Sequence, residues 1–348
     1  MVKYLSSIKE TERLKTVPKV GDKAGKALFQ EGYTLEKLAT AVPQDIVNIL
    51  KYTMKKSQEV IANAQTILAK DSPPPLLASE YQKEMDNIRW TLKTDSKELN
   101  KLLGGGFKSY STVGASGPFS TGKTQLGNEM IVQVQKMFPN EDEGYTIFIE
   151  TELDTFSNRR LTQMATGKGV TYNPDKVILV PSQRIMDVGN QYYQYERAND
   201  LAMSMGADVK LIIVDSFTAL FKRKYSGRAL FPDRSQELGR HLSYLEDMTK
   251  RFNAVLYCTC QVIEVPVTPQ EAKGGYSSAN TYWDTGTRYI PWGGNVLKHT
   301  LGTWISMDKK GKTTYQFILF DSSELPKGDI LIAITSSGLK DVTKRELV

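Results

Sequence analysis

Hydrophobic positions change their spacing along the chain, and the change marks two structural regions. In residues 1–70, leucine, isoleucine and valine recur at helical spacing, and Gly21, Gly32 and Pro43 separate the runs. The segment 71–80 follows and contains three consecutive prolines, which cannot lie inside a helix and favour a stiff, extended connector. The pattern predicts a small helical domain over residues 1–70 and a linker over residues 71–95.

From residue 96 onward, apolar runs of strand length alternate with amphipathic helices. A short helix is predicted over 96–103, before three glycines. The predicted strands are 145–150, 177–181, 209–215 and 254–261, and the predicted helices between them are 123–137, 186–205 and 233–252. Such alternation predicts an α/β domain over 96–348 with a parallel sheet covered by helices on both faces. Shorter runs at 315–320 and 330–334 predict an antiparallel extension of that sheet.

Composition and charge narrow the class of protein. With 348 residues, 40% of them hydrophobic, the chain is expected to form about two globular domains. No apolar run approaches the roughly 18 residues of a membrane helix, so we expect a soluble, intracellular protein without membrane contact. The net charge is +6, and residues 1–70 contribute most of it with twelve cations against seven acids. That excess is compatible with a polyanionic partner but does not establish one.

Cysteine and histidine are too scarce for several kinds of site. Cys258 and Cys260 are the only cysteines and lie two apart in one apolar run, so we expect two buried thiols on the same side of a strand. His241 and His299 are the only histidines, which makes a zinc site or a histidine-based triad improbable. Catalysis is therefore expected to use carboxylates, lysine, hydroxyls and backbone amides.

The strongest motif is GPFSTGKT at residues 117–124, which matches the P-loop pattern G-x-x-x-x-G-K-[ST]. In such a loop, glycines let successive N–H groups point at a phosphate, beside the N-terminus of the following helix. The lysine then reaches the β- and γ-phosphates, and the threonine hydroxyl coordinates magnesium. Nucleotide contacts are expected from Gly117, Pro118, Phe119, Ser120, Thr121, Gly122, Lys123, Thr124 and Gln125.

Acidic and amide side chains stand at the ends of three predicted strands. Asp215 closes KLIIVD, a Walker-B pattern, and is expected to hold magnesium, although a strand-end acid can also cap a turn. Glu150 and Glu152 follow another strand, and either could polarise the attacking water. The residues alone favour neither glutamate. Gln261 closes the strand AVLYCTC and could hydrogen-bond a γ-phosphate or simply be a surface residue.

Three segments are candidates for DNA binding. Residues 222–236 hold five cations and one acid, which suits phosphate contacts but also a solvated loop. Residues 262–294 show no regular pattern and combine five aromatic residues with glycines; this suits base stacking, and the alternative is a folded lid with inward aromatics. Residues 17–28 resemble a helix-hairpin-helix, whose turn offers amides to a DNA phosphate, although an ordinary helical turn would look similar.

Together these motifs resemble RecA-type recombinases of the archaeal RadA branch and their eukaryotic counterparts. The resemblance covers about residues 15–342. It includes GPFSTGKTQ, IIVDS, YSGR followed by DRSQELGRHL, a Gln-Val pair after a buried strand, IPWGGNVLKH and GLKDV, in family order. It implies a RecA-type P-loop ATPase core, a small all-α helix-hairpin-helix N-terminal domain, and ATP and Mg²⁺ as cofactors.

The resemblance also implies roles for individual residues. Glu152 matches the catalytic glutamate, which acts with Lys123 and the γ-phosphate sensor Gln261, and Arg160 matches the arginine that stacks on adenine. Asp321 and Pro326 match a cap over a neighbour's nucleotide. The two loops, 222–236 and 262–294, match the DNA-binding loops. The residues expected to contact DNA, or to link the second loop to the γ-phosphate, are Arg228, Arg234, Lys222, Arg223, Tyr282, Trp283, Gly293, Gly294 and His299.

The function that the resemblance implies is ATP-dependent DNA strand exchange. The expected partners are single- and double-stranded DNA and further copies of the chain, in a helical filament or ring. The location would be cytoplasmic and nucleoid-associated, or nuclear in a eukaryote. The family's Phe-x-x-Ala-like tether aligns with residues 76–79, where Leu76 replaces the aromatic anchor. Two alternatives remain: a paralogue that assists a recombinase without exchanging strands, and a DNA-unrelated P-loop ATPase or kinase.

Overall fold

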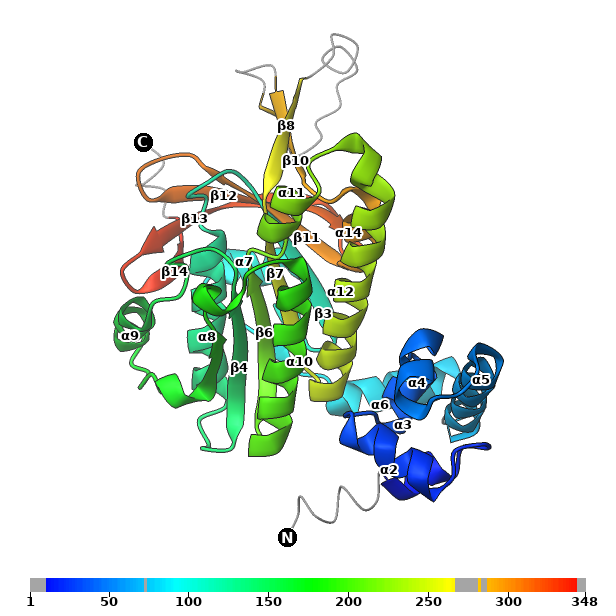
Figure 1. Ribbon diagram of the computed structural model, residues 1–348. Coiled ribbons are helices and arrows are strands. Elements are labelled where there is room, and N and C mark those ends of the chain that lie inside the picture. The colour runs from blue at the N-terminus through cyan, green and yellow to red at the C-terminus, as the bar shows by residue number, and fades with distance from the viewer. Residues whose placement is uncertain (1–10, 72–73, 267–280, 283–286, 343–348) are drawn as a thin grey trace. The chain divides into compact units, whose positions relative to one another are not determined.

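The computed structural model describes residues 11–71, 74–266, 281–282 and 287–342 (Figure 1). The chain divides into two compact units, Met1–Lys83 and Glu84–Val348. This division lies inside the segment 71–95 that the sequence predicts as a linker. Each unit has its own hydrophobic core, and each is described by itself below.

The N-terminal unit is helical, as its apolar spacing predicts. Its labelled helices, together with the helix that spans the division, are α2 (Asp22–Gln30), α3 (Leu35–Ala39), α4 (Pro43–Leu50), α5 (Met54–Asp71) and α6 (Ala78–Ile88). The apolar faces of α2 to α5 meet in one core that includes the fully buried Leu28, Leu38 and Val60, whereas α6 has no buried residue. The extended part of the linker is shorter than predicted, because α6 already begins at Ala78. The Glu80 carboxylate accepts a hydrogen bond from the Leu77 N–H, 3.0 Å away, and thereby supports the first turn of α6.

A nine-stranded sheet forms the centre of the second unit, in the order β14-β13-β12-β11-β3-β7-β6-β4-β5. Strands β11, β3, β7, β6, β4 and β5 run parallel, and β12, β13 and β14 extend the sheet antiparallel, as predicted. The bounds are β3 (Ser111–Ser116), β4 (Glu143–Glu150), β5 (Val177–Val180), β6 (Asp208–Asp215), β7 (Val255–Cys260), β11 (Thr303–Lys309), β12 (Thr314–Ser322), β13 (Gly328–Thr335) and β14 (Gly338–Asp341).

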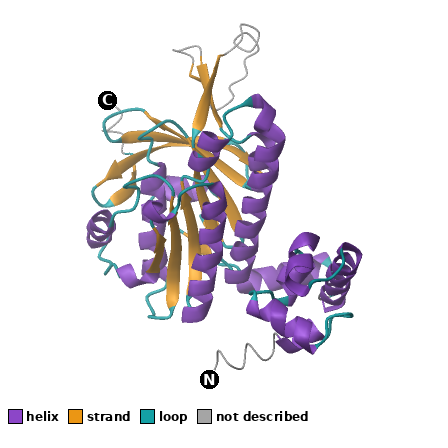
Figure 2. Cartoon of the chain, viewed as in Figure 1, coloured by secondary structure: helices purple, strands orange, loops and turns teal. Residues whose placement is uncertain are grey.

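Helices cover both faces of this sheet (Figure 2). On one face pack α7 (Lys97–Leu102), α8 (Lys123–Met137) and α9 (Asn158–Thr166), and on the other α10 (Val188–Met205), α11 (Ala219–Lys224), α12 (Phe231–Phe252) and α14 (Gly294–Thr300). Short elements complete the unit: β1 (Thr91–Leu92), β2 (Phe107–Lys108) and the 3₁₀ turns η1 (Pro174–Lys176), η2 (Ser182–Arg184) and η3 (Arg228–Leu230). Cys258 and Cys260 are free, buried thiols in the same core, as predicted.

Residues 262–294 depart from the prediction that they lack regular structure. Val262–Pro266 (β8) pairs antiparallel with Thr287–Pro291 (β10), and Thr281–Tyr282 (β9) adds two residues to the other side of β10. The strands β8 and β10 project beyond the main sheet (Figure 1). No helix in the described part of the chain is long and apolar enough to cross a bilayer.

Gly114 and Trp304 provide a test of the core packing. They pair in register on β3 and β11, and a methyl group on Gly114 would lie 2.7 Å from the buried Trp304 ring. Gly114→Ala should therefore lower the free energy of unfolding by about 1–3 kcal/mol through overpacking. The measurement is chemical denaturation. Gly239→Ala is the control: this helical glycine has no neighbour within 4 Å, so the change should raise stability by about 1 kcal/mol. Equal stabilities for the two variants would contradict the packing.

Candidate nucleotide site and nucleic-acid interface

The P-loop connects β3 to α8 at the carboxyl edge of the parallel strands. Gly117 and Gly122 adopt φ values of +154° and +96°, and a Cβ on Gly117 would lie 2.1 Å from the carbonyl oxygen of Met307. Only glycine can make this turn so close to the neighbouring strand. The loop opens onto the N-terminus of α8, whose unpaired N–H groups and dipole favour an anion.

Lys123 is the cation of this loop, and in the described structure it binds the loop's own oxygens. Its Nζ donates to the carbonyl oxygens of Gly117 (2.8 Å) and Pro118 (2.7 Å). Burial lowers the pKa of the Lys123 ammonium, while the nearby Asp215 carboxylate opposes that shift. The ammonium is thus held where a phosphate would compete for it.

Asp215 lies at the end of β6 and meets the P-loop threonine. Its carboxylate accepts hydrogen bonds from the hydroxyls of Thr124, 2.6 Å away, and Thr259. Burial raises the pKa of Asp215, and the two hydroxyl bonds oppose the shift. Thr124 and Asp215 together offer the oxygen ligands that Mg²⁺ prefers. Among the described residues no cluster of three or more histidine, cysteine, aspartate or glutamate side chains is placed to hold a metal ion.

The structure separates the two glutamates that the sequence leaves equivalent. Glu150 is buried, and its carboxylate accepts the N–H groups of Thr155, Phe156 and Ser182, each 3.0 Å away. These bonds tie β4 to two following turns and leave Glu150 no free face for a water molecule. Glu152 is only half-buried, and its Oε1 accepts a hydrogen bond from Nε2 of Gln261.

Strand β7 places polar side chains under the P-loop at every second residue. The Tyr257 hydroxyl donates to the carbonyl oxygen of Lys123, 2.7 Å away. Thr259 then donates to Asp215, and Gln261, directly after the strand, to Glu152. Sequence analysis singled out Gln261 and missed the other two. The period-two alternation of β7, counted back from Gln261, is the signal that identifies them.

Arg160 lies on α9, and its guanidinium donates four hydrogen bonds. It donates to the Gln125 side chain (2.8 Å), to Gln163 (2.8 Å) and to the carbonyl oxygens of Thr335 and Ser336 (2.7 Å each). These contacts bring α9, the start of α8 and the β13–β14 turn together beside the P-loop.

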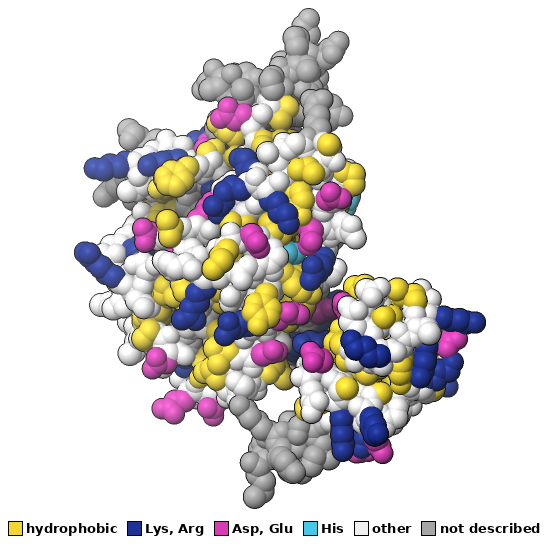
Figure 3. Space-filling view, in the orientation of Figure 1, with side chains coloured by type: hydrophobic (Ala, Val, Ile, Leu, Met, Phe, Trp, Pro, Cys, Tyr) yellow, Lys and Arg dark blue, Asp and Glu magenta, His cyan; other side chains and the backbone are white. Residues whose placement is uncertain are grey.

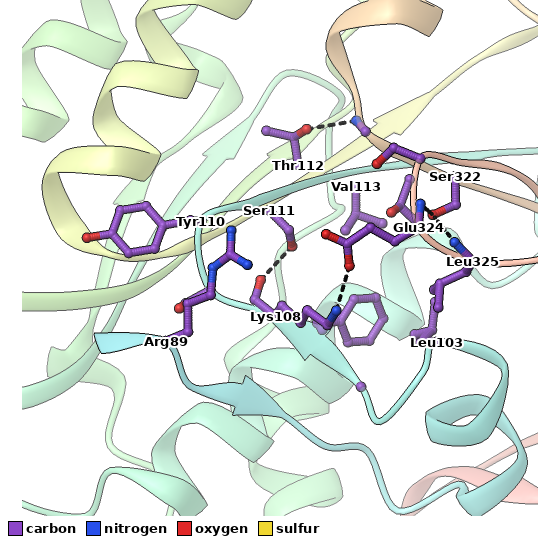
Figure 4. A pocket seen from close by; sticks show the side chains of 16 residues that line it. Arg89, Leu103, Lys108, Tyr110, Ser111, Thr112, Val113, Ser322, Glu324 and Leu325 are labelled. Carbon is purple, nitrogen blue, oxygen red and sulfur yellow. Dashed lines mark hydrogen bonds and ion pairs between the residues drawn. The ribbon is translucent and has the colours of Figure 1, made fainter. Parts of the chain in front are cut away.

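Asp321 and Pro326 do not lie at this P-loop. Asp321 pairs with Trp304, near the amino end of β11, and both cap candidates are exposed. The segment between them lines a pocket of about 170 Å³ at the amino edge of the sheet (Figure 4). In that pocket the Lys108 ammonium and the Glu324 carboxylate form an ion pair of 2.6 Å, so the charge of Glu324 is already compensated.

The basic segment 222–236 runs from the last turn of α11, through η3, into α12. Lys222 donates to the carbonyl oxygen of Val262 (3.3 Å), whereas Arg223 is exposed. Arg228 begins η3. The Arg234 guanidinium contacts two rings, 4.3 Å from that of Phe231 and 5.1 Å from that of Trp292. Cationic and anionic side chains are interspersed over the face shown in Figure 3.

The segment 262–294 is brought next to the P-loop edge by Gln261. Tyr282 lies in β9, Gly293 and Gly294 adopt positive φ before α14, and His299 is exposed on that helix. Trp283 lies outside the described residues. Trp292, one of the five aromatic residues of this segment, is only 7% exposed, so in this conformation it packs inward and is not available to stack on a base.

In the turn at residues 17–28, two main-chain carbonyl oxygens accept hydrogen bonds from side chains of the same unit. The Tyr52 hydroxyl donates to the carbonyl of Lys19 (3.0 Å), and the Asn63 amide to that of Pro18 (3.3 Å). Helix α2 begins after Gly21 without a side-chain cap, so no capping side chain covers its first amides.

Comparison with known proteins agrees with this geometry. A model of the Rad51 family matches residues 86–342. The chain belongs to the Rad51 family. It therefore has a RecA-type core, and it is similar to proteins named DNA repair and recombination protein RadA. Those of Aeropyrum pernix and Metallosphaera sedula are each 29% identical, over 96% of this chain and 98% of their own length. That of Methanococcus voltae is 28% identical over 95% of this chain and its full length.

The contacts of Glu150 generate a stability prediction. Glu150→Gln would place an amide NH₂ against main-chain N–H donors and leave one of them unpaired. The free energy of unfolding should fall by about 1–3 kcal/mol, the cost of an unsatisfied buried group. Chemical denaturation is the measurement, and Glu152→Gln, at a half-buried position with a single partner, is the control and should change stability by less than about 1 kcal/mol. An equal loss in both variants would contradict the distinction between the two glutamates.

Proposed function

We propose that this protein is an ATP-dependent DNA strand-exchange protein that forms a nucleoprotein filament on single-stranded DNA. The observation that carries the proposal is the contact between Glu152 and Gln261. It joins the residue expected to act on the γ-phosphate to the strand that continues into β8 and the segment 262–294. The names of the relatives, which refer to DNA repair and recombination, support the same conclusion.

The P-loop edge supports ATP hydrolysis with the following roles. Lys123 and the first amides of α8 hold the phosphates, and Thr124 and Asp215 hold Mg²⁺, which neutralises phosphate charge when bound. Glu152 orients and deprotonates the attacking water, and Gln261 positions Glu152 and senses the γ-phosphate. Arg160 contacts the adenine from α9. Asp321 and Pro326, which lie away from this P-loop, cap the nucleotide of a neighbouring copy.

DNA binding is assigned to three segments of different character. The basic segment 222–236, through Arg228, Arg223, Lys222 and Arg234, contacts phosphates, so its contribution should depend on salt. The segment 262–294, through Tyr282 and Trp283, stacks on bases and contributes little charge. The turn at 17–28 contacts phosphates through main-chain amides. Homology is then tested by base pairing between the two DNA strands.

One observation favours a second function, a RadA-like paralogue that assists a recombinase without exchanging strands. Leu76 stands where the family tether has an aromatic anchor, so assembly would rest on a smaller apolar side chain. No observation favours a DNA-unrelated kinase now that the family is known.

A strand-exchange assay separates the two functions. The protein is incubated with ATP, Mg²⁺, single-stranded DNA and a homologous duplex. Joint molecules formed by this protein alone support the proposal. Exchange that requires a second recombinase supports the assisting paralogue, and absence of DNA-stimulated ATP hydrolysis overturns both.

Replacement of Glu152 tests the catalytic assignment. Glu152→Gln should retain ATP binding and slow DNA-stimulated hydrolysis by roughly two or more orders of magnitude, because the general base is lost. Phosphate-release kinetics measure the rate. The matched control is Glu150→Gln, which should slow hydrolysis far less, since Glu150 only ties turns together. The reverse ranking would show that Glu150 is the base. Lys123→Ala should abolish nucleotide binding in the same preparation.

Replacement of Leu76 tests the assembly assignment. Leu76 is 43% exposed, and Leu77, beside it, is 69% exposed. If Leu76 inserts into a neighbouring copy, Leu76→Ala should weaken self-association by about 2–5 kcal/mol, the cost of deleting a buried leucine side chain. Sedimentation velocity with ATP and DNA measures assembly. Leu77→Ala is the control. Equal sedimentation of Leu76→Ala and the parent protein would place the tether elsewhere.

A further inference from the structure

Trp292 lies between the two functional regions and contacts both. Its main-chain N–H donates to the carbonyl oxygen of Gln261, 2.8 Å away, and its indole lies 5.1 Å from the Arg234 guanidinium. The Gln261 N–H in turn donates to the Thr218 hydroxyl (2.8 Å), and the Gln261 side chain to Glu152. An unbroken series of contacts therefore runs from Glu152 to Arg234.

Among the described residues, Arg234 contacts two aromatic rings and forms no ion pair with an acid. Its guanidinium lies 4.3 Å from the Phe231 ring and 5.1 Å from the Trp292 ring, and a Cβ on Gly294 would lie 3.5 Å from its Nη2. Its Nε is buried without a hydrogen-bond partner among the described residues. Cation–π contacts of this kind are worth roughly 0.5–2 kcal/mol. They fix the direction of the guanidinium without neutralising its charge, which leaves the charge available to a phosphate.

We propose that Trp292 is a positioning residue that couples the nucleotide site to DNA binding through Arg234. This inference rests on the proposed function. The Gln261 amide has two alternative acceptors, the Glu152 carboxylate seen here and a γ-phosphate. Because the Gln261 main chain is hydrogen-bonded to Trp292, a change of acceptor displaces the indole and redirects Arg234. The nucleotide state at Gln261 thus sets the direction of the Arg234 guanidinium, which lies 27 residues earlier in the chain.

The test measures how much a nucleotide improves DNA affinity. Anisotropy of a labelled oligo-dT gives the dissociation constant with a non-hydrolysable ATP analogue and Mg²⁺, and again without nucleotide; their ratio is the coupling factor. Couplings between sites are typically about 5- to 150-fold. Trp292→Leu should reduce the factor below about twofold. Trp292→Phe, which keeps a ring, should retain most of it.

A double-mutant cycle separates coupling from simple phosphate contact. Arg234→Gln should also reduce the factor below about twofold, and the double variant should lose no more, because both residues act on one path. Arg234→Gln alone should flatten the salt dependence of binding. If Trp292→Leu does not fold, the Arg234→Gln variant still tests the inference, because a change at the half-exposed Arg234 is compatible with folding. The matched control is Arg240→Gln: Arg240 lies on the same helix as Arg234, and the change removes its 3.9 Å cation–π contact with Tyr192 of α10 and should leave the factor intact.

Each outcome decides the inference. A coupling factor that persists in Trp292→Leu or in Arg234→Gln overturns it while leaving strand exchange standing. A factor that falls equally in Arg240→Gln also overturns it, because the loss would then reflect helix α12 as a whole. A wild-type protein that binds DNA equally with and without nucleotide overturns both the inference and the filament model on which it rests.

Discussion

The central constraint is the position of β7 between β3, which carries the P-loop, and β6, which carries Asp215. Side chains alternate along a strand, so residues 257, 259 and 261 face the same side. Tyr257 holds the first turn of α8, Thr259 holds Asp215, and Gln261 holds Glu152. One strand thus fixes the three groups to which we assign phosphate binding, metal binding and hydrolysis.

This arrangement also explains how a carboxylate can be buried at the P-loop edge. A buried carboxylate without partners would be protonated or would destabilise the fold, and two hydroxyl donors offset that cost at Asp215. The opposite face of β7 carries Cys258 and Cys260 into an apolar core, so the strand cannot shift without disturbing packing. Where β7 ends, the chain continues through Gln261 into β8, so the first strand of the segment 262–294 begins at the P-loop edge.

The sequence predicted those parts of the fold and site that depend on local pattern. The P-loop spacing, helix 123–137 and the alternation of strands and helices all have strong periodic or motif signals. Helix α9 was missed because its nine residues are mostly polar, and β8 and β10 because two short strands lie far apart in an irregular segment.

Other features could not be predicted because they depend on tertiary contacts. Glu150 and Glu152 have the same strand alternation, and they are distinguished by tertiary contacts: the N–H groups of Thr155, Phe156 and Ser182 bind Glu150, whereas the Gln261 amide binds Glu152. The sequence left open whether the aromatic residues of 262–294 stack on bases or pack inward, because composition cannot show that Trp292 contacts the Gln261 carbonyl and the Arg234 guanidinium beside the core.

The claim that a nucleotide at the P-loop edge controls assembly on DNA is tested most directly by electron microscopy. The wild-type protein would be imaged on long single-stranded DNA with Mg²⁺ and ATP, and again without nucleotide. The account predicts continuous helical filaments along the DNA with ATP and their loss when ATP is omitted. Filaments that are equally abundant without ATP, or isolated particles in both conditions, would contradict it.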